Sequence, residues 1–230
     1  MKIIFLNAWE GHQASDIKKF ILTQSVDTDI FCFQESRRNQ KSAVFCQELL
    51  PQFDLVSTDK YFNELKKFNQ ATFVKKNLKI IDTQTIGQKD PEVGLSLFTQ
   101  IKSQSNLLNI CNVHGIAWPG DKQDTPARLH QSQLIIDFFQ NLNGPKIIGG
   151  DFNLDSNIKS VQIFEDNGFK NLIKEFKIPT TRNEISWRKY KNKQLFADFL
   201  FVSSDIKIKK FSVPNIEISD HLPLILEIEI

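Results

Sequence analysis

The sequence is poor in the residues that hold small secreted proteins and zinc modules together. Only three of its 230 residues are cysteines, and Cys32, Cys46 and Cys111 form no C-x-x-C pair. A disulfide framework or a cysteine-based zinc site is therefore not expected, and a reducing compartment is the natural setting. Cys32 and Cys111 stand in apolar runs, where a free cysteine behaves as a small hydrophobic residue.

Long hydrophobic segments are also missing. No run approaches the roughly 18 apolar residues of a membrane-spanning helix. The apolar start, residues 1–6, is interrupted by Asn7 and Glu10, and it is too short for the core of a signal peptide. We therefore expect a cytoplasmic protein that makes no membrane contact.

The chain has little net charge, +2 at pH 7, and no Gly-rich phosphate loop, linker or low-complexity tract. A weak total charge neither indicates nor excludes nucleic acid as a partner, because binding needs only a local basic face. By contrast, 40% of the residues are hydrophobic, including 20 phenylalanines, which is enough for an extensive core. We expect a single domain over residues 1–230 that is a monomer with no obligate protein partner.

Hydrophobic periodicity predicts many strands and few helices. The expected strands cover residues 2–8, 29–35, 53–58, 70–75, 78–86, 93–102, 106–114, 146–151, 195–203, 206–213 and 223–230. The expected helices cover residues 15–25, 40–50, 126–142 and 157–167. This composition favours an α/β sandwich of two packed sheets with helices outside, and not a Rossmann fold. A faint similarity between residues 2–7 and 146–153 fits two related halves, or chance.

Polar side chains repeatedly mark the ends of these apolar strands. They are Asn7, Glu35, His114, Asp151, Asn153, Asp198, Asp220 and His221. Strand ends are rigid, so groups placed there keep their geometry. A buried carboxylate without a partner is costly, and such a set therefore implies a metal or mutual hydrogen bonds. The oxygens of Glu, Asp and Asn suit a hard cation, Mg²⁺ or Mn²⁺, rather than zinc.

Glu35 is the first candidate metal ligand. It ends the apolar strand expected at residues 29–35, where its carboxylate could bind a largely hydrated Mg²⁺. A surface ion pair with Arg37 or Arg38 would account for Glu35 equally well.

The segment Gly149-Gly150-Asp151-Phe152-Asn153-Leu154 is the sharpest local motif. Its two glycines allow backbone or substrate to approach closely. Asp151 and Asn153 would point the same way on a continuing strand. There Asp151 could orient or deprotonate an attacking water, and Asn153 could donate to phosphoryl oxygens. A simple turn before the helix near residue 157 would use the same residue types.

A second motif, Ser219-Asp220-His221, precedes the last expected strand. With a carboxylate on one ring nitrogen, His221 becomes a positioned base or a cation beside a phosphate. Asp198 is the candidate carboxylate, because a lone Asp in the apolar run 195–202 needs a buried partner. The alternatives are a turn histidine with local partners and an edge-strand aspartate that faces water.

Four weaker features are each compatible with a functional and a structural role. His114 could contact a phosphate or a leaving oxygen, or it could cap its strand. Two candidate substrate-binding residues are Arg128, which could reach a phosphate or lie in solvent, and Trp118, which could stack on a base or simply pack. The basic and aromatic stretch 187–193 could hold a nucleic-acid backbone, or form a solvated hairpin tip.

Together these residues resemble the endonuclease/exonuclease/phosphatase family. The matching features, in chain order, are Asn7, Gln34-Glu35, Asn112-x-His114, Gly150-Asp151-x-Asn153, Asp198 and Ser219-Asp220-His221. Each motif alone is weak, but six in the correct order along almost the whole chain are specific. The resemblance implies a four-layer αββα sandwich with two mostly antiparallel sheets and a site at the strand ends between them.

The resemblance also implies in-line hydrolysis of a phosphoester by water, assisted by Mg²⁺ or Mn²⁺. Glu35 would bind the metal, aided by Asn7 and, through water, by Asp220. Among the catalytic residues, Asp151 would position the nucleophile. Asn153 and His114 would hold phosphoryl oxygens, and His221 with Asp198 would stabilise the transition state.

The opening segment around Asn7 departs from the pattern of exonuclease III relatives, and His114 stands where they usually carry a tyrosine. The histidine is more similar to the deoxyribonuclease I, deadenylase and sphingomyelinase branches. The breadth of the family and the stretch 187–193 lead us to expect a phosphodiesterase acting on nucleic acid. The alternatives are a phosphoesterase for a small phosphorylated metabolite or lipid headgroup, and a non-catalytic binding module on the same fold.

Overall fold

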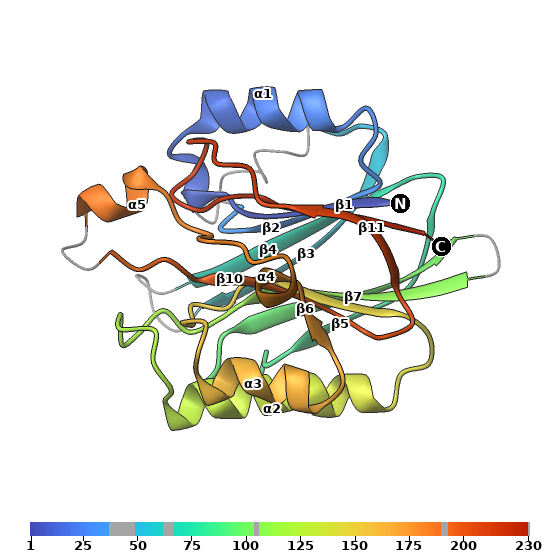
Figure 1. Cartoon of the computed structure of the whole chain (residues 1–230). Coiled ribbons are helices and arrows are strands. Elements are labelled where there is room, and N and C mark those ends of the chain that lie inside the picture. The colour runs from blue at the N-terminus through green and yellow to red at the C-terminus, as the bar shows by residue number, and fades with distance from the viewer. Residues whose placement is uncertain (37–48, 62–66, 104–105, 190–192, 230) are drawn as a thin grey trace.

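The computed structural model describes residues 1–36, 49–61, 67–103, 106–189 and 193–229. These residues form two six-stranded sheets that pack face to face, with helices on both outer sides. The four layers are visible in Figure 1, where α1 lies above one sheet and α2 and α3 lie below the other. The predicted αββα sandwich is thereby confirmed.

Both sheets share the same pattern of strands. The first has the order β11(Lys207–Ser212), β12(Leu224–Glu229), β1(Lys2–Asn7), β2(Ile30–Gln34), β4(Lys67–Lys75), β3(Phe53–Tyr61). The second has the order β5(Lys79–Ile86), β6(Leu95–Ser103), β7(Asn106–His114), β8(Lys146–Asp151), β10(Asp198–Val202), β9(Lys170–Asn171). Among the described pairings, β1–β2 and β7–β8 are parallel and the others are antiparallel.

A helix connects the two strands of each parallel pair, as parallel pairing requires a long crossover. Helix α1 (Ala14–Gln24) follows β1, and α2 (Pro126–Gln140) follows β7. The second sheet is also covered by α3 (Lys159–Asp166), while η1 (Trp9–Gly11), α4 (Leu172–Glu175) and α5 (Glu184–Lys189) are short. The two halves of the sandwich are therefore related, with β1 corresponding to β7. Because residues 146–151 form β8, the faint sequence similarity between residues 2–7 and 146–153 does not pair corresponding strands.

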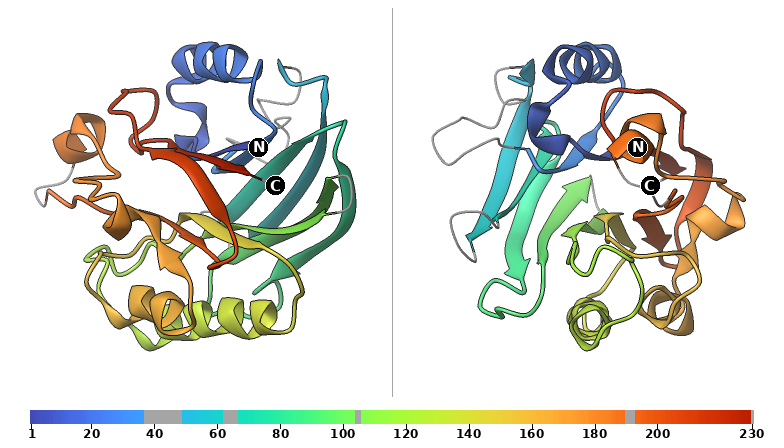
Figure 2. Two further views of the ribbon diagram at one scale, coloured as in Figure 1. Left: turned by 45° about the vertical axis from the view of Figure 1, so that its right-hand side comes forward. Right: turned by 90° about the vertical axis from the view of Figure 1, so that its left-hand side faces the viewer.

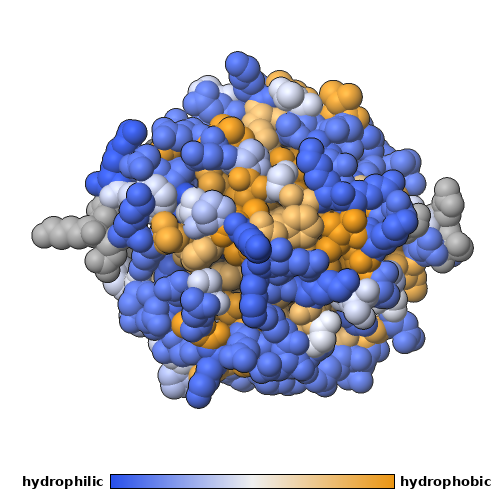
Figure 3. Space-filling view, in the orientation of Figure 1, coloured by the Kyte–Doolittle hydropathy of each residue, from blue (hydrophilic) through white to orange (hydrophobic). Residues whose placement is uncertain are grey.

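Side-chain alternation along β1 explains how one apolar strand serves two layers. Ile3 and Phe5 belong to the core between the sheets, whereas Ile4 and Leu6 belong to the core beneath α1. A strand covered on both faces has no polar face, and a continuous apolar run results. The apolar surface that remains in the orientation of Figure 1 gathers across the middle of the molecule, between hydrophilic helical layers (Figure 3).

Three buried amides cross-link the sheets next to the strand ends. Gln34 Nε2 donates to Asn112 Oδ1 (2.6 Å), and Asn112 Nδ2 donates to the carbonyl oxygens of Phe33 (3.1 Å) and Ala71 (3.2 Å). Gln70 Nε2 donates back to the carbonyl oxygen of Asn112 (2.8 Å). Because unpaired buried amides are costly, this network fixes how the two sheets face one another.

Most of the predicted elements are present in the structure, and two differences from the prediction bear on the site. The strand expected at residues 195–203 begins only at Asp198, so this carboxylate starts β10 and does not interrupt a strand. Residues 184–189 form helix α5 rather than part of a hairpin. The helix expected at residues 40–50 lies almost wholly outside the described residues. Within the described part, none of the helices has the length and apolar character needed to cross a membrane.

Candidate active site

The polar strand ends meet at one end of the sandwich. Parallel pairing sets Asn7 beside Gln34 in the first sheet and His114 beside Asp151 in the second. Antiparallel pairing then sets Asp198, the first residue of β10, beside Asp151. The right-hand view of Figure 2 looks onto this end, where the loop after β7 and helix α5 lie around the strand ends.

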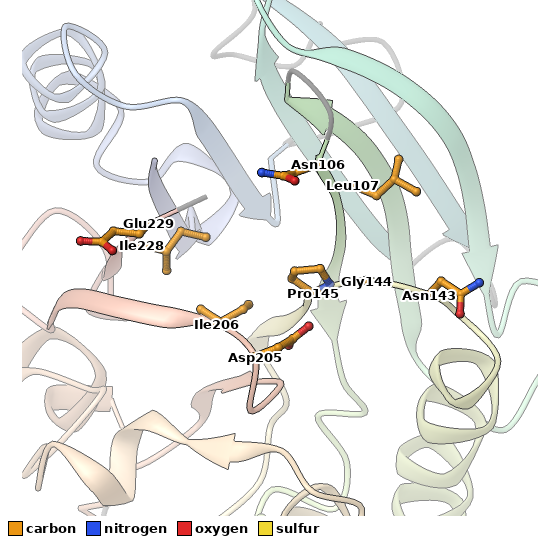
Figure 4. A pocket seen from close by; sticks show the side chains of 9 residues that line it. All are labelled: Asn106, Leu107, Asn143, Gly144, Pro145, Asp205, Ile206, Ile228 and Glu229. Atoms are coloured by element: carbon orange, nitrogen blue, oxygen red, sulfur yellow. The ribbon is translucent and has the colours of Figure 1, made fainter.

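A cleft of about 510 Å³ opens over these residues. Its lining includes most of the predicted site together with several residues that the sequence did not single out: Trp9, Glu35, Ala117, Trp118, Gly120, Lys122, Asp151, Asn153, Arg182, Gln194, Asp220 and His221. A second pocket of about 500 Å³ lies where β7 and β8 begin and β12 ends (Figure 4). Asp205 and Glu229 are the ionisable residues lining that pocket, whereas the clustered carboxylates and histidines lie at the carboxyl ends of the parallel strands.

Asp151 is the hub of the site's hydrogen bonds. Its Oδ2 accepts from Asn7 Nδ2 (2.9 Å) and Asn153 Nδ2 (3.1 Å), and its Oδ1 accepts from the Asn153 amide nitrogen (2.9 Å). Burial alone would raise the pKa of Asp151, but the neighbouring cations His221 and Lys122 hold it well below its usual range. Asp151 is therefore a carboxylate at neutral pH, suited to orienting a water rather than to storing a proton.

Glu35 stands opposite, on the first sheet. Asn7 Nδ2 donates to Glu35 Oε1 (3.2 Å), and Asn7 Oδ1 accepts from the Trp9 amide nitrogen (2.9 Å). Asn7 thus turns an N–H towards both carboxylates and connects Glu35 of the first sheet with Asp151 of the second. The backbone of Glu35 is left-handed (φ 50°), a strained conformation that clusters at functional sites.

The carboxylates of Glu35 and Asp151 belong to a cluster of side chains that could bind a cation. Burial, followed by the negative charges of Asp220 and Asp151, raises the pKa of Glu35 to about 7. Glu35, His114 and Asp151 each offer a potential ligand atom, and these atoms lie within 4.8 Å of one another. Crowded carboxyl oxygens of this kind fit a hard divalent cation, which would remove the repulsion.

His221 is held by Asp198, as the sequence predicted. Its Nδ1 lies 2.9 Å from both carboxylate oxygens of Asp198, and both side chains are buried. Thr181 Oγ1 fixes the start of β10 by accepting from the amide nitrogens of Ala197 and Asp198 (3.1 Å each). Burial lowers the pKa of His221, but the surrounding carboxylates outweigh burial and raise it above its ordinary value.

Arg182 contacts this pair and was not foreseen. Its Nη1 is hydrogen-bonded to His221 Nε2, and its Nη2 donates to Asp220 Oδ2 (3.3 Å). Arg182 therefore ties the Asp220–His221 turn to the segment before α5, through an isolated bridge between residues 182 and 221. No sequence pattern singles out Arg182, because it stands in the polar run Thr180-Thr181-Arg182-Asn183, which has no apolar periodicity.

His114 is a neutral member of the site. Its Nε2 lies 3.6 Å from Glu35 Oε1 and 3.9 Å from Asp151 Oδ2. Burial lowers the pKa of His114 to about 4, although Asp151 opposes the shift. At neutral pH this ring is therefore uncharged and offers a neutral hydrogen-bonding group rather than a cation.

The pKa of His114 predicts an acid-sensitive contribution to folding. A base with a lowered folded pKa favours the native state above its unfolded pKa, near 6.5, and loses this contribution as pH falls towards 4. Between pH 7 and pH 5, metal-free wild type should therefore lose roughly 2 kcal/mol relative to a His114→Gln variant. Urea denaturation of both proteins in EDTA measures this difference. An unchanged difference at the two pH values would show that His114 is not buried in its neutral form.

The two predicted substrate-binding residues have different positions. Trp118 lines the cleft and is 71% exposed, so its ring is available to a ligand. Arg128 is 2% exposed and is not part of the cleft. Its guanidinium donates to the carbonyl oxygens of Gln123 (2.5 Å) and Ile116 (3.3 Å). Arg128 therefore supports the loop after β7, because the N–H groups of its planar guanidinium donate to acceptors in that loop.

The stretch 187–193 does not form an open stacking surface in its described part. Trp187 Nε1 donates to the carbonyl oxygen of Gln194 (2.8 Å), and Lys193 Nζ lies 4.1 Å from the centre of the Trp187 ring. Tyr190 lies outside the described residues. The ring of Trp187 is thus partly occupied by its own chain.

Comparison with known proteins agrees with this geometry. An endonuclease/exonuclease/phosphatase family protein from Bacteroides vulgatus superposes with a TM-score of 0.78 at 17% identity, covering 99% of this chain and 98% of that one. A mannosyl-6-phosphatase from Bacteroides thetaiotaomicron gives 0.70 at 16% identity, with complete coverage of both chains. The human Nocturnin catalytic domain with a bound sulfate gives 0.72 at 15% identity, covering 100% and 94%.

These structural likenesses concern the fold. No curated protein matches the sequence significantly. The sequence itself matches the profile of the Endonuclease/Exonuclease/phosphatase family over residues 5–221. The chain therefore belongs to this family of phosphoester hydrolases.

Proposed function

We propose that this protein hydrolyses a phosphoester by in-line attack of water, with a divalent cation, Mg²⁺ or Mn²⁺, bound at Glu35. The observation that carries the proposal is the convergence of Asn7, Glu35 and Asp151 from two sheets onto shared hydrogen bonds. Carboxylates are brought together in this way, against their mutual repulsion, where a cation and a reacting group must be held. In the reaction, the oxygen of water bonds to phosphorus as the ester P–O bond breaks.

Glu35 would hold the cation, with Asp220 acting through water and Asn7 keeping Glu35 in place. When bound, the cation would supply positive charge to the phosphoryl oxygens and favour ionisation of water. Asp151 would orient the attacking water, because its low pKa keeps it a hydrogen-bond acceptor. One proton of the water ends on the leaving oxygen, and the other remains on the phosphate product.

The remaining catalytic roles follow from which groups can donate. His114 would offer a neutral donor to a phosphoryl oxygen. Asn153 would share this role by turning one amide N–H to the phosphate from Asp151 or Gly115, the acceptors that take both of its N–H groups in this structure. His221, held by Asp198, would stabilise the transition state beside the phosphoryl group. The sharing of Asn153 Nδ2 with Asp151 and the carbonyl oxygen of Gly115 (3.2 Å) fixes the amide in the site.

We further propose nucleic acid as the substrate, cleaved as a phosphodiester. Trp118 and Trp9 both line the cleft, and aromatic faces beside a phosphate site can stack on bases whatever their sequence. A second candidate is a small phosphorylated metabolite or lipid headgroup. The cleft volume of about 510 Å³ is typical of small-molecule sites, and one structural neighbour is a mannosyl-6-phosphatase.

Replacing Asp151 by asparagine should lower the rate of metal-dependent hydrolysis at least about 10²-fold, because an amide cannot hold the water as an anion does. The wild type and the variant would be incubated with Mg²⁺ or Mn²⁺ and a substrate panel. The panel contains plasmid, single-stranded and abasic DNA, RNA, and small phosphomonoesters and phosphodiesters. The substrate that is cleaved identifies the substrate class.

Asp54→Asn is a matched control, since Asp54 is exposed on β3 and does not line the cleft. It should retain wild-type rates. If no substrate is hydrolysed with either metal, or if the Asp151 variant is as active as the wild type, the catalytic proposal fails. A non-catalytic binding module would then be the better description of this chain.

A further inference from the structure

Lys122 is a buried cation in the cleft that the roles above do not use. It belongs to the loop after β7, is 5% exposed, and lines the cleft. Its Nζ donates to Asn153 Oδ1 (2.7 Å), and among the described residues it forms no ion pair with a carboxylate. An ammonium has three N–H groups, so the contact with Asn153 leaves two of them for another acceptor.

The loop that carries Lys122 is built to hold it rigidly. The carbonyl oxygen of Lys122 accepts from the Asp155 amide nitrogen (2.9 Å), and its backbone is left-handed (φ 60°). Gly115, where the loop begins, lies so close to the segment after β8 that a Cβ would come within 2.0 Å of the Phe152 carbonyl oxygen. Arg128 donates to carbonyl oxygens along the same loop. Lys122 is therefore fixed at its backbone as well as at its tip.

The burial of this charge without an ion pair indicates a role beyond holding Asn153. Burial lowers the pKa of Lys122 to about 8, against the opposing effect of Asp151, so the ammonium form still prevails at neutral pH. A neutral side chain could donate to Asn153 Oδ1 without the cost of burying a charge. Arg182, the buried guanidinium that lines the cleft, is already bonded to Asp220 and His221.

We propose that Lys122 is a catalytic residue whose ammonium donates to a phosphoryl oxygen of the substrate. The proposal rests on the phosphoester hydrolysis proposed above and adds a fixed positive charge from the loop side of the cleft. Phosphoryl transfer is promoted mainly by positioned charge on the equatorial oxygens, with little covalent chemistry for the protein to perform. Lys122 keeps its proton throughout and forms no bond to phosphorus.

Two substitutions separate the charge from the hydrogen bond. Lys122→Gln keeps a donor for Asn153 but removes the charge, whereas Lys122→Met removes both. Each should lower kcat about 10²-fold and weaken competitive inhibition by inorganic phosphate, measured with Mg²⁺, at least about tenfold. If the methionine variant does not fold, Lys122→Gln still tests the proposal. Thermal melting shows whether each variant is folded.

Lys60→Met is the matched control, because Lys60 is also a buried lysine but donates to the carbonyl oxygens of Gly87 (2.6 Å) and Val93 (2.8 Å), outside the cleft. It should lose stability and keep its inhibition by phosphate. A Lys122→Gln variant with near-wild-type kcat, or with unchanged phosphate inhibition, would reduce Lys122 to a support for Asn153 and overturn the proposal. An inactive wild type would instead overturn the proposed function, which makes the two failures distinguishable.

Discussion

Replacing Asp198 by asparagine should slow hydrolysis about 10³-fold while leaving the protein folded. Both carboxylate oxygens of Asp198 lie 2.9 Å from His221 Nδ1, which keeps the ring proton on that nitrogen. An asparagine would turn its NH₂ group or a weaker, neutral acceptor towards the ring. The ring would then lose its anionic partner, and its pKa would fall because burial and Arg182 already disfavour the charged form.

Two measurements distinguish this effect from a general loss of structure. The melting temperature should change little, and the pH at which kcat falls should move to lower values in the variant, since His221 would lose its proton earlier. Asp205→Asn is a suitable control, because Asp205 follows the same strand, β10, but lines the pocket at the far end of the sandwich. An Asp198→Asn enzyme within tenfold of the wild type would show that His221 acts without its carboxylate.

Replacing Gly150 by alanine should cost about 4 kcal/mol or more of folding stability. Gly150 has φ +128°, and a Cβ there would lie 2.3 Å from the Val113 carbonyl oxygen and 2.8 Å from Gln34 Nε2. The first contact is with the backbone of β7, which cannot move without breaking its parallel pairing with β8. The second disturbs the amide network between the sheets, so steric and polar losses add together.

The neighbouring glycine provides the comparison. A Cβ at Gly149 would meet Leu200 Cδ1 at 2.3 Å, the end of a side chain that can rotate, so Gly149→Ala should cost only about 1–3 kcal/mol. Urea titration of the two variants and the wild type measures both costs. Equal stabilities for the two variants would show that the backbone of β7 moves to accommodate a Cβ at Gly150, contrary to the expectation above.

The strand framework and most of the site could be predicted because their signals are local. A strand covered on both faces is a continuous apolar run, and a polar group that ends such a run stands out, as Asp151 and His114 do. Asp198 stood out for the same reason, although the strand begins at this residue. The partner of His221 could be inferred because a lone carboxylate in apolar surroundings needs one.

Other members of the site could not be predicted because their burial depends on tertiary contacts. Lys122 lies in a polar loop, where a lysine is normally solvated, and its burial beside Asn153 is a tertiary contact. Arg128 shows the converse: its place near a helix start suggested phosphate binding, yet the carbonyl oxygens of its own loop surround it. Arg182 reaches the site through a single bridge to His221, a pairing without a sequence pattern.

The pairing of β1 with β12 has a consequence for how the chain folds. Residues 2–5 pair with residues 224–227 in the interior of the first sheet, so this contact closes nearly the whole chain into a loop. Closure entropy rises only slowly with loop length, but non-local pairing of this kind slows folding. Asp220 and His221 immediately precede β12. A chain that lacks residues 220–229 therefore lacks both an interior strand of the first sheet and two residues of the candidate active site.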